Sequence, residues 1–283
     1  MDRSKNYTLI INLIFFLVWS CGLAYCIYRY WKLKARRELK ERVWKLHKEL
    51  QELEAVDPFS VQKAIENQFE KYARHSLQME CQPTNDVNMN QLKTASRLAE
   101  NKLRIGSIDE ENENLICQIY GEMMKNTNFT GRYRVDNVKI SRLDGSLCIN
   151  RPRHEDVAKL INDCVEQLNS EENKCPNGPM QILETAIETK MQFMFIHPFP
   201  DANGMLSSTI FNGILRNAGF PWIPIPCESK LKYLQATEEY YDQNEYCSIY
   251  YLMMELVEES LQEVIKNSKL KRRSEKKLSW LLV

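Results

Sequence analysis

The sequence predicts a mostly α-helical domain with a small β-hairpin, preceded by a single transmembrane helix and a stalk helix. Residues 8–28 contain no charged side chain, and this length matches the roughly 20 residues that a helix needs to cross a bilayer. Through most of the remaining chain, apolar residues recur every three or four positions, which is the spacing of one helical face. Asp144-Gly145, between apolar residues, is a strong turn signal for a hairpin.

Composition limits the number of domains and excludes several classes of function. With 283 residues, of which 43% are hydrophobic and 27% charged, the chain can form one substantial core with a small appendage. Its 38 basic and 38 acidic residues balance, so no overall positive field attracts nucleic acid. Nine scattered cysteines and four histidines form no zinc-binding pattern. We therefore expect neither nucleic-acid binding nor a zinc site.

The apolar run at 8–28 is expected to be a membrane anchor rather than a cleaved signal peptide. A signal peptide has a shorter apolar core and a cleavage site with small residues, and the sequence shows neither. Basic residues are more numerous after the run than before it, which favours the cytoplasm for the C-terminal side. Those after the run are Arg29, Lys32, Lys34, Arg36 and Arg37, and those before it are Arg3 and Lys5.

Five segments are expected along the chain. They are an N-terminal tail (1–7), the transmembrane helix (8–28), a stalk helix and linker (29–90), the main domain (91–267) and a basic C-terminal tail (268–283). The stalk carries apolar residues at alternating steps of four and three, namely Leu39, Val43, Leu46, Leu50 and Leu53. Because this pattern covers only about two heptads, packing on the domain is favoured over a coiled coil.

Within the main domain, helical periodicity and turn residues predict a series of short elements. Helices are expected around 91–104, 108–125 and 157–168, and a short hairpin is expected between the second and the third. The run from Ile182 to Ile196 becomes apolar on nearly every face, which is typical of a central helix surrounded by the rest of the fold. Pro198 stops this helix, and Gly204 opens another.

The loop between these two helices carries the candidate chemistry. Ala202, Asn203 and Gly204 are small residues at a helix N-terminus, where free backbone N–H groups and the helix dipole favour an anion such as phosphate. His197 can accept a proton from a hydroxyl near neutral pH, and Asp201 is an oxygen ligand suited to Mg²⁺. The simpler alternative is that His197 caps one core helix and Asp201 caps the next.

The string His197-Pro198-Phe199-Pro200-Asp201-Ala202-Asn203-Gly204 resembles the Fic motif His-Pro-Phe-x-Asp-(Gly/Ala)-Asn-Gly at every fixed position. The resemblance covers about residues 91–267 and implies a Fic-type helical domain. It implies that His197 is the general base for a Ser, Thr or Tyr hydroxyl of a target protein. It also implies that Asp201 holds Mg²⁺ on the phosphates of ATP. Asn203 and Gly204, with the small Ala202 beside them, would then lie against those phosphates.

Two further stretches resemble the same family. Gly131-Arg132-Tyr133-Arg134 resembles the entry to the flap that docks the target protein, which places the docking site on the hairpin at 139–149. Ser96-Arg97-Leu98-Ala99-Glu100-Asn101 is similar to the family's inhibitory pattern, in which the glutamate pairs with an arginine of the Fic motif. The resemblance therefore gives Glu100 an inhibitory role, while an exposed helical glutamate is the alternative.

The chain departs from the family directly after Gly204. The family continues with two arginines that contact nucleotide phosphates, and this chain has Met205 and Ser208 at those positions. Each lost charge-assisted contact costs about 1.5–3 kcal/mol, so we expect weakened ATP binding. Arg216 lies eight residues, or about 12 Å of helix rise, beyond Ser208 and is too far away to replace it.

Two functions follow from this pattern. The first is a protein adenylyltransferase that uses ATP and Mg²⁺, weakened by the loss of both arginines. The alternative is a catalytically inactive, membrane-tethered binding module. The animal branch of the family implies the endoplasmic reticulum membrane with a lumenal domain, whereas the flanking charges favour the cytoplasm, so the side stays open. The same resemblance is compatible with a homodimer.

Overall fold

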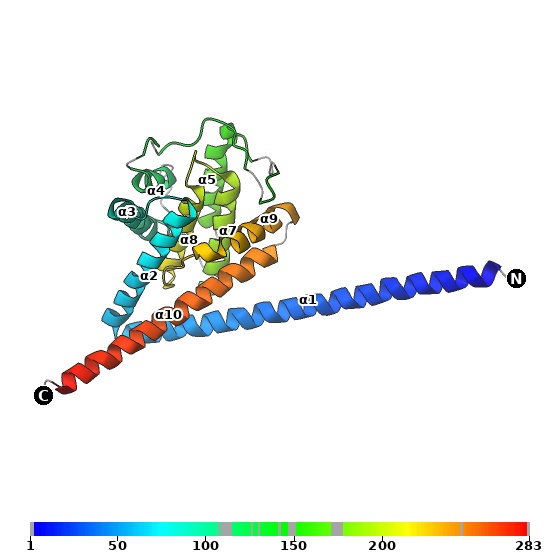
Figure 1. Ribbon diagram of the computed structural model, residues 1–283, viewed down its shortest axis with the longest axis horizontal. Helices are drawn as coiled ribbons and strands as arrows, with labels where there is room; N and C mark the ends of the chain where they lie inside the picture. Colours follow the sequence, from blue (N-terminus) through cyan, green and yellow to red (C-terminus); the bar gives the residue numbers. More distant parts are fainter. Residues whose placement is uncertain are drawn as a thin grey trace. The chain divides into compact units, whose positions relative to one another are not determined.

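The computed structural model describes residues 3–106, 108, 115–125, 127–129, 131–140, 143–146, 151–170, 178–243 and 246–281. It divides the chain into two compact units, residues 1–42 and 43–283, and the candidate site lies in the second. The domain is mostly helical (Figure 1). Its α-helices are α1 (Arg3–Val56), α2 (Pro58–Met79), α3 (Asp86–Lys102), α4 (Leu115–Met123), α5 (Val157–Leu168), α7 (Pro179–Ile196), α8 (Asn203–Asn217), α9 (Lys230–Gln243) and α10 (Tyr246–Leu281). Two short 3₁₀ helices are η2 (His154–Asp156) and η3 (Cys227–Ser229).

Local sequence signals explain where the first helices of the domain begin. Asp57 is the N-cap of α2, and its side chain accepts a hydrogen bond from the Ser60 N–H at 3.1 Å. Pro58 takes the first helical position, where its missing N–H costs nothing. Asn85 caps α3 in the same way through the Asn88 N–H at 2.9 Å. The chain therefore passes from α1 to α2 at Asp57-Pro58.

Helix α8 lies at the centre of the domain and packs against α2, α3, α4 and α7. Eleven of its fifteen residues are buried, so it is covered by other elements on more than one face. Helix α3 approaches α8 closely at Gly213, where a side chain would not fit: a Cβ added to Gly213 would lie 2.8 Å from the Ala99 Cβ of α3. This close packing fixes the position of α8, whose first turn forms one wall of the candidate site.

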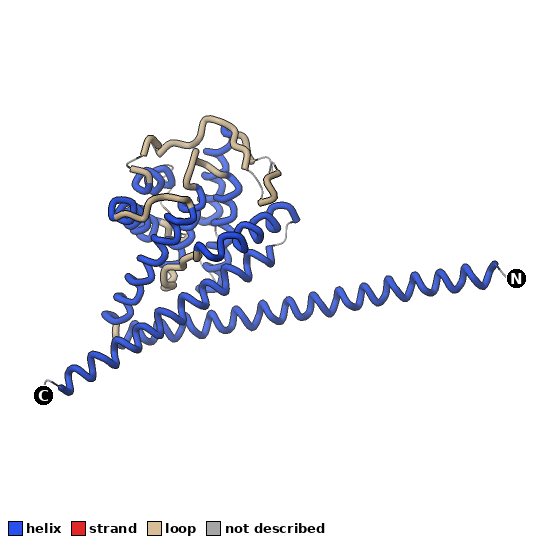
Figure 2. Tube along the Cα trace, in the orientation of Figure 1, coloured by secondary structure: helices blue, strands red, loops and turns tan. Residues whose placement is uncertain are grey.

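The structure corrects the prediction of a β-hairpin flap at 139–149. Among the residues that the structure describes, no strand is present (Figure 2). Backbone groups here bond to other parts of the fold: Leu143 N–H donates to Glu238 Oε1 at 2.8 Å. The Asp-Gly signal produces only a local turn, in which Asp144 Oδ1 accepts from Ser146 N–H at 2.9 Å and Gly145 has a φ of +81°. Residues 141–142 and 147–150 lie outside the described part.

The structure also corrects the predictions of a transmembrane helix at 8–28 and of a single-pass protein at the endoplasmic reticulum membrane. Within the described ranges, none of the helices combines the length and the apolar character needed to cross a membrane. Residues 8–28 are one part of the 54-residue helix α1. Beyond that run α1 carries charged residues at close intervals, such as Lys34 and Glu38, which pair at 3.9 Å.

Candidate functional site

The loop from His197 to Ala202, which joins α7 to α8, is held in one shape by its own side chains. The Asn203 amide is buried and bonds both backbone groups of Phe199, accepting from its N–H at 3.0 Å and donating to its carbonyl at 2.8 Å. Phe199 in turn stacks on Tyr120 with ring centroids 3.8 Å apart. Asn203 therefore shapes the loop, and its side-chain amide is already occupied there.

Backbone strain also marks the two ends of this loop. His197 and Ala202 have φ values of 52° and 55°, in the left-handed region that residues other than glycine seldom adopt. Such conformations cost about 1–3 kcal/mol each and concentrate at functional sites. The only other non-glycine residue with positive φ among the described positions is Cys81, directly after the end of α2.

The His197 imidazole stays neutral at pH values well below those at which an ordinary histidine becomes protonated. Burial lowers its pKa from 6.5 to about 4, and the positive charge of Arg151 acts in the same direction. The Asp201 carboxylate acts in the opposite direction, so these two candidate residues of the loop interact electrostatically. At pH 7 the ring is therefore available to accept a proton.

Arg134 holds the start of the loop from outside. Its guanidinium is 4% exposed and donates to backbone carbonyls only, including those of His197 at 2.9 Å, Pro152 at 2.5 Å and Asp136 at 2.8 Å. Its own N–H donates to the Pro198 carbonyl at 2.9 Å. Because a cation is stabilised at a helix C-terminus, Arg134 also suits the end of α7 electrostatically.

We expect Arg134→Met to lower the free energy of unfolding by about 2–4 kcal/mol, because several buried carbonyls lose a charged donor together. The matched control is Arg132→Met, which removes the same charge from an exposed side chain two residues away. Urea unfolding of both variants measures the difference. Equal stability of the two variants would show that Arg134 does not hold the loop.

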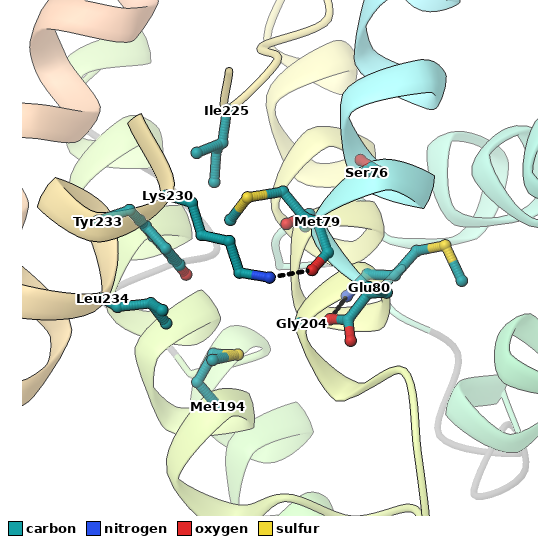
Figure 3. A pocket seen from close by; sticks show the side chains of 11 residues that line it. Ser76, Met79, Glu80, Met194, Gly204, Ile225, Lys230, Tyr233 and Leu234 are labelled. Carbon is teal, nitrogen blue, oxygen red and sulfur yellow. Dashed lines mark hydrogen bonds between the residues drawn. The ribbon is translucent and has the colours of Figure 1, made fainter. Parts of the chain in front are cut away.

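The N-terminus of α8 already holds an anion from the same chain. Glu80, the C-cap residue directly after α2, accepts a hydrogen bond from the Met205 N–H through Oε1 at 3.1 Å. Its carboxylate lies against Gly204, where any added Cβ would collide with it (Figure 3). Burial raises the pKa of Glu80, and the nearby Asp201 carboxylate raises it further. The carboxylate thus occupies the place where the sequence predicts a phosphate.

A cavity of about 190 Å³ adjoins this contact. It is lined by residues of α2, α7, α8 and α9, among them Glu80, Met194, Gly204, Ser208, Lys230 and Tyr233 (Figure 3). Lys230 donates to the Met79 carbonyl at 2.7 Å and thereby holds the end of α2. Behind Ser208 lies Lys190 of α7, which is 1% exposed and whose Nζ donates to Ser208 Oγ at 2.8 Å.

Asp201 is the residue that fits a divalent cation. Within the part of the chain that the structure describes, no group of three or more His, Cys, Asp or Glu side chains is placed to hold a metal ion alone. Mg²⁺ at nucleotide sites usually takes one or two carboxylates and completes its coordination with phosphates and water. The Asp201 carboxylate matches that donor set. Glu80 lies close enough for the two carboxylates to repel each other.

The structure brings most of the sequence-predicted site residues together but leaves Glu100 apart. Glu100 accepts from Arg216 Nε at 3.1 Å, near the C-terminal end of α8 and about 18 Å of helix rise from Gly204. Its inhibitory role stays a prediction, and the structure supplies no contact between it and the loop. Sequence reasoning missed Glu80 and Lys190, and it assigned Arg134 to the flap entry rather than to the loop. A lysine within the apolar run before His197 was the one available signal, since buried lysines are rare.

Comparisons with known proteins agree with this geometry. The Fic/DOC family matches residues 110–215, a range that includes the whole loop. A protein adenylyltransferase, fic-1 of Caenorhabditis briggsae, is 30% identical over 79 residues, which are 28% of this chain and 15% of that protein's length. The chain thus matches only a small part of this curated relative.

Solved structures show the same fold over most of the chain. A Fic domain-containing signalling protein from Bacteroides thetaiotaomicron has a TM-score of 0.67 at 16% identity, covering 81% of this chain and 97% of that one. Fic-1 from C. elegans has a TM-score of 0.66 at 18% identity, covering 95% of this chain and 80% of that one. The motif, the loop geometry and the match at residues 110–215 agree in relating this part of the chain to the Fic/DOC family.

Proposed function

We propose that the protein transfers AMP from ATP to a Ser, Thr or Tyr hydroxyl of another protein. One observation carries this proposal: a neutral imidazole, a carboxylate and a helix N-terminus are held together on one rigid loop, at His197, Asp201 and Gly204. A base, a metal ligand and an anion site are the groups that nucleotidyl transfer requires. The similarity to the C. briggsae adenylyltransferase supports the same reaction class.

In the proposed reaction, the target hydroxyl oxygen attacks the α-phosphorus of ATP. A new P–O ester bond forms, the bond between the α- and β-phosphates breaks, and pyrophosphate leaves. His197 takes the hydroxyl proton. Asp201 would hold Mg²⁺, which neutralises phosphate charge when bound. The loop positions these groups in advance because Asn203 and Phe199 fix its shape.

The proposal is tested by incubating the protein with cell extract, Mg²⁺ and ATP labelled on its α-phosphate. We expect label on protein that survives denaturation, because the product is a covalent phosphodiester. ATP labelled only on the γ-phosphate is the control, and the protein should add no label to that of the extract alone, since pyrophosphate is released. Label from the γ-phosphate that depends on the added protein would indicate a kinase and contradict the proposal.

We expect the labelling rate to change little between pH 7.5 and pH 5.5 at saturating Mg²⁺-ATP. With a pKa of about 4, His197 remains almost wholly neutral at both values. For a histidine with the ordinary pKa of about 6.5, the protonated form would exceed the neutral form about tenfold at pH 5.5. The labelling rate would fall by a corresponding factor. A tenfold loss with an apparent pKa near 6.5, in protein still folded by circular dichroism, would show that burial does not shift His197.

A second candidate is a binding module without turnover. The specific observation in its favour is that Glu80 fills the anion position at the start of α8 while Met205 and Ser208 replace two charged residues. In that case calorimetry with Mg²⁺-ATP should detect no binding, and the α-phosphate assay should detect no label. Such a module would still bind a protein partner through the surface around the loop.

A further inference from the structure

Ser208 and Lys190 form a pair at the position where the Fic motif would carry its second arginine. Ser208 belongs to α8 and lines the cavity beside Glu80 and Gly204. Lys190 comes from the neighbouring helix α7 and reaches Ser208 Oγ from the buried side. An amine therefore lies behind the position from which an arginine of α8 is missing, although a different helix supplies it.

The hydrogen bonds leave the Ser208 hydroxyl with a proton to donate. Lys190 Nζ, which has only donors, also contacts the neighbouring Ser207 Oγ at 3.2 Å. Ser207 uses its own proton on the Gly204 carbonyl at 2.9 Å. Ser208 Oγ accepts from Lys190, and no acceptor for its proton lies among the residues that the structure describes. That proton is available to a group in the cavity.

Lys190 is an unusual buried amine, since its two hydrogen-bonding partners are neutral hydroxyls. Its Nζ also lies 5.3 Å from the centre of the Tyr233 ring of α9. Burial lowers the pKa of Lys190 to about 7, and the Glu80 carboxylate of α2 acts against this shift. An anion bound in the cavity would favour the charged form of Lys190, as the Glu80 carboxylate does. A hydroxyl that accepts from an ammonium group is polarised and becomes a stronger donor.

We propose that Ser208, polarised by Lys190, donates a hydrogen bond to a phosphate of the bound nucleotide and so replaces the missing arginine of α8. Ser208 is the contacting residue, and Lys190 is a positioning residue that acts through it. This inference rests on the proposed function, because the ligand is the same nucleotide. The phosphate enters when Glu80 leaves, since both anions use the first turn of α8.

The experiment is calorimetric titration of the full chain with Mg²⁺-ATP. Four variants are compared with the parent: Ser208→Ala, Lys190→Met, the double variant, and Ser208→Thr, which keeps the hydroxyl. Lys159→Met is the charge-matched control, since Lys159 lies on the exposed face of α5 and pairs only with Asp163 at 3.6 Å. Thermal unfolding midpoints show that each variant is folded.

We expect Ser208→Ala and Lys190→Met each to weaken ATP binding by about tenfold. The double variant should be hardly weaker than either single variant, because the two residues act as one unit. Ser208→Thr and Lys159→Met should bind as the parent does. If Lys190 had only a structural role, Lys190→Met would lower the thermal unfolding midpoint. Its effect on ATP affinity would then add to that of Ser208→Ala in the double variant.

Two failures are distinguishable. If the parent binds Mg²⁺-ATP and Ser208→Ala binds it equally well, this inference is wrong while the proposed function stands. If the parent binds neither Mg²⁺-ATP nor pyrophosphate, and removing the Glu80 carboxylate does not restore binding, the proposed function is wrong and this inference falls with it.

Discussion

Replacing His197 with alanine is expected to lower the rate of AMP transfer by a factor of about 10² to 10⁴, the usual contribution of a general base. The imidazole is neutral at pH 7 because of its burial, and it interacts electrostatically with Asp201 on the same loop. His197 is not among the fully buried residues of the core. The α-phosphate labelling assay measures the loss, and ATP affinity should remain near that of the parent.

The choice of variant matters because His197 has a left-handed backbone conformation. Alanine in this region costs about 1–2 kcal/mol, whereas asparagine tolerates it. His197→Asn therefore removes the base with less strain and should be as inactive as His197→Ala. The control is His75→Ala, which removes an imidazole that contacts Cys227 instead of the loop. If His197→Asn labels protein as fast as the parent does, His197 is not the general base.

Much of the site could be predicted from sequence because its residues are adjacent in the chain. The proline at 198 and the small residues before Gly204 fix a helix end and a helix start within a few residues, and the structure places both there. The contact of Asn203 with a phosphate stays a prediction. The structure shows that its amide closes the loop on Phe199, a role that depends on side-chain orientation and leaves no mark in spacing.

The rest of the site depends on contacts between distant segments. Glu80 and Met205 are 125 residues apart, and no local pattern indicates that α2 ends against α8. The amine behind Ser208 comes from Lys190 of α7 rather than from the motif, so counting arginines within α8 does not reveal it. Met205 is 3% exposed and lines the same cavity as Glu80, so an arginine restored there would have to fit a nearly buried position.

The hairpin prediction failed for a related reason. Asp144-Gly145 specifies a turn, and a turn is present, but a ladder requires that the flanking residues pair with each other. Here Leu143 bonds to Glu238 of α9, and Arg134 bonds to the loop after α7. Turn chemistry is local, while strand pairing is decided by what else the backbone can reach.

Removing the Glu80 carboxylate is expected to raise the affinity for Mg²⁺-ATP by about tenfold or more and to raise the labelling rate with it. The carboxylate occupies the Met205 N–H and lies against Gly204, so a phosphate can enter only after it has left. Its negative charge near Asp201 also opposes an incoming anion. One competing charged hydrogen bond of about 1.5–3 kcal/mol corresponds to a tenfold change or somewhat more.

Glu80→Ala is the variant that tests this expectation, because glutamine would still offer an oxygen to the Met205 N–H. Glu166→Ala is the matched control, since Glu166 is an exposed glutamate of α5 outside the cavity. Calorimetry with Mg²⁺-ATP and the α-phosphate assay are run on both variants and the parent. Glu100→Ala should leave ATP affinity unchanged, because Glu100 pairs with Arg216 at the far end of α8. If Glu80→Ala binds ATP no better than the parent while Glu100→Ala binds it better, the inhibitory carboxylate is Glu100, and the contact between Glu80 and α8 plays no part in nucleotide access.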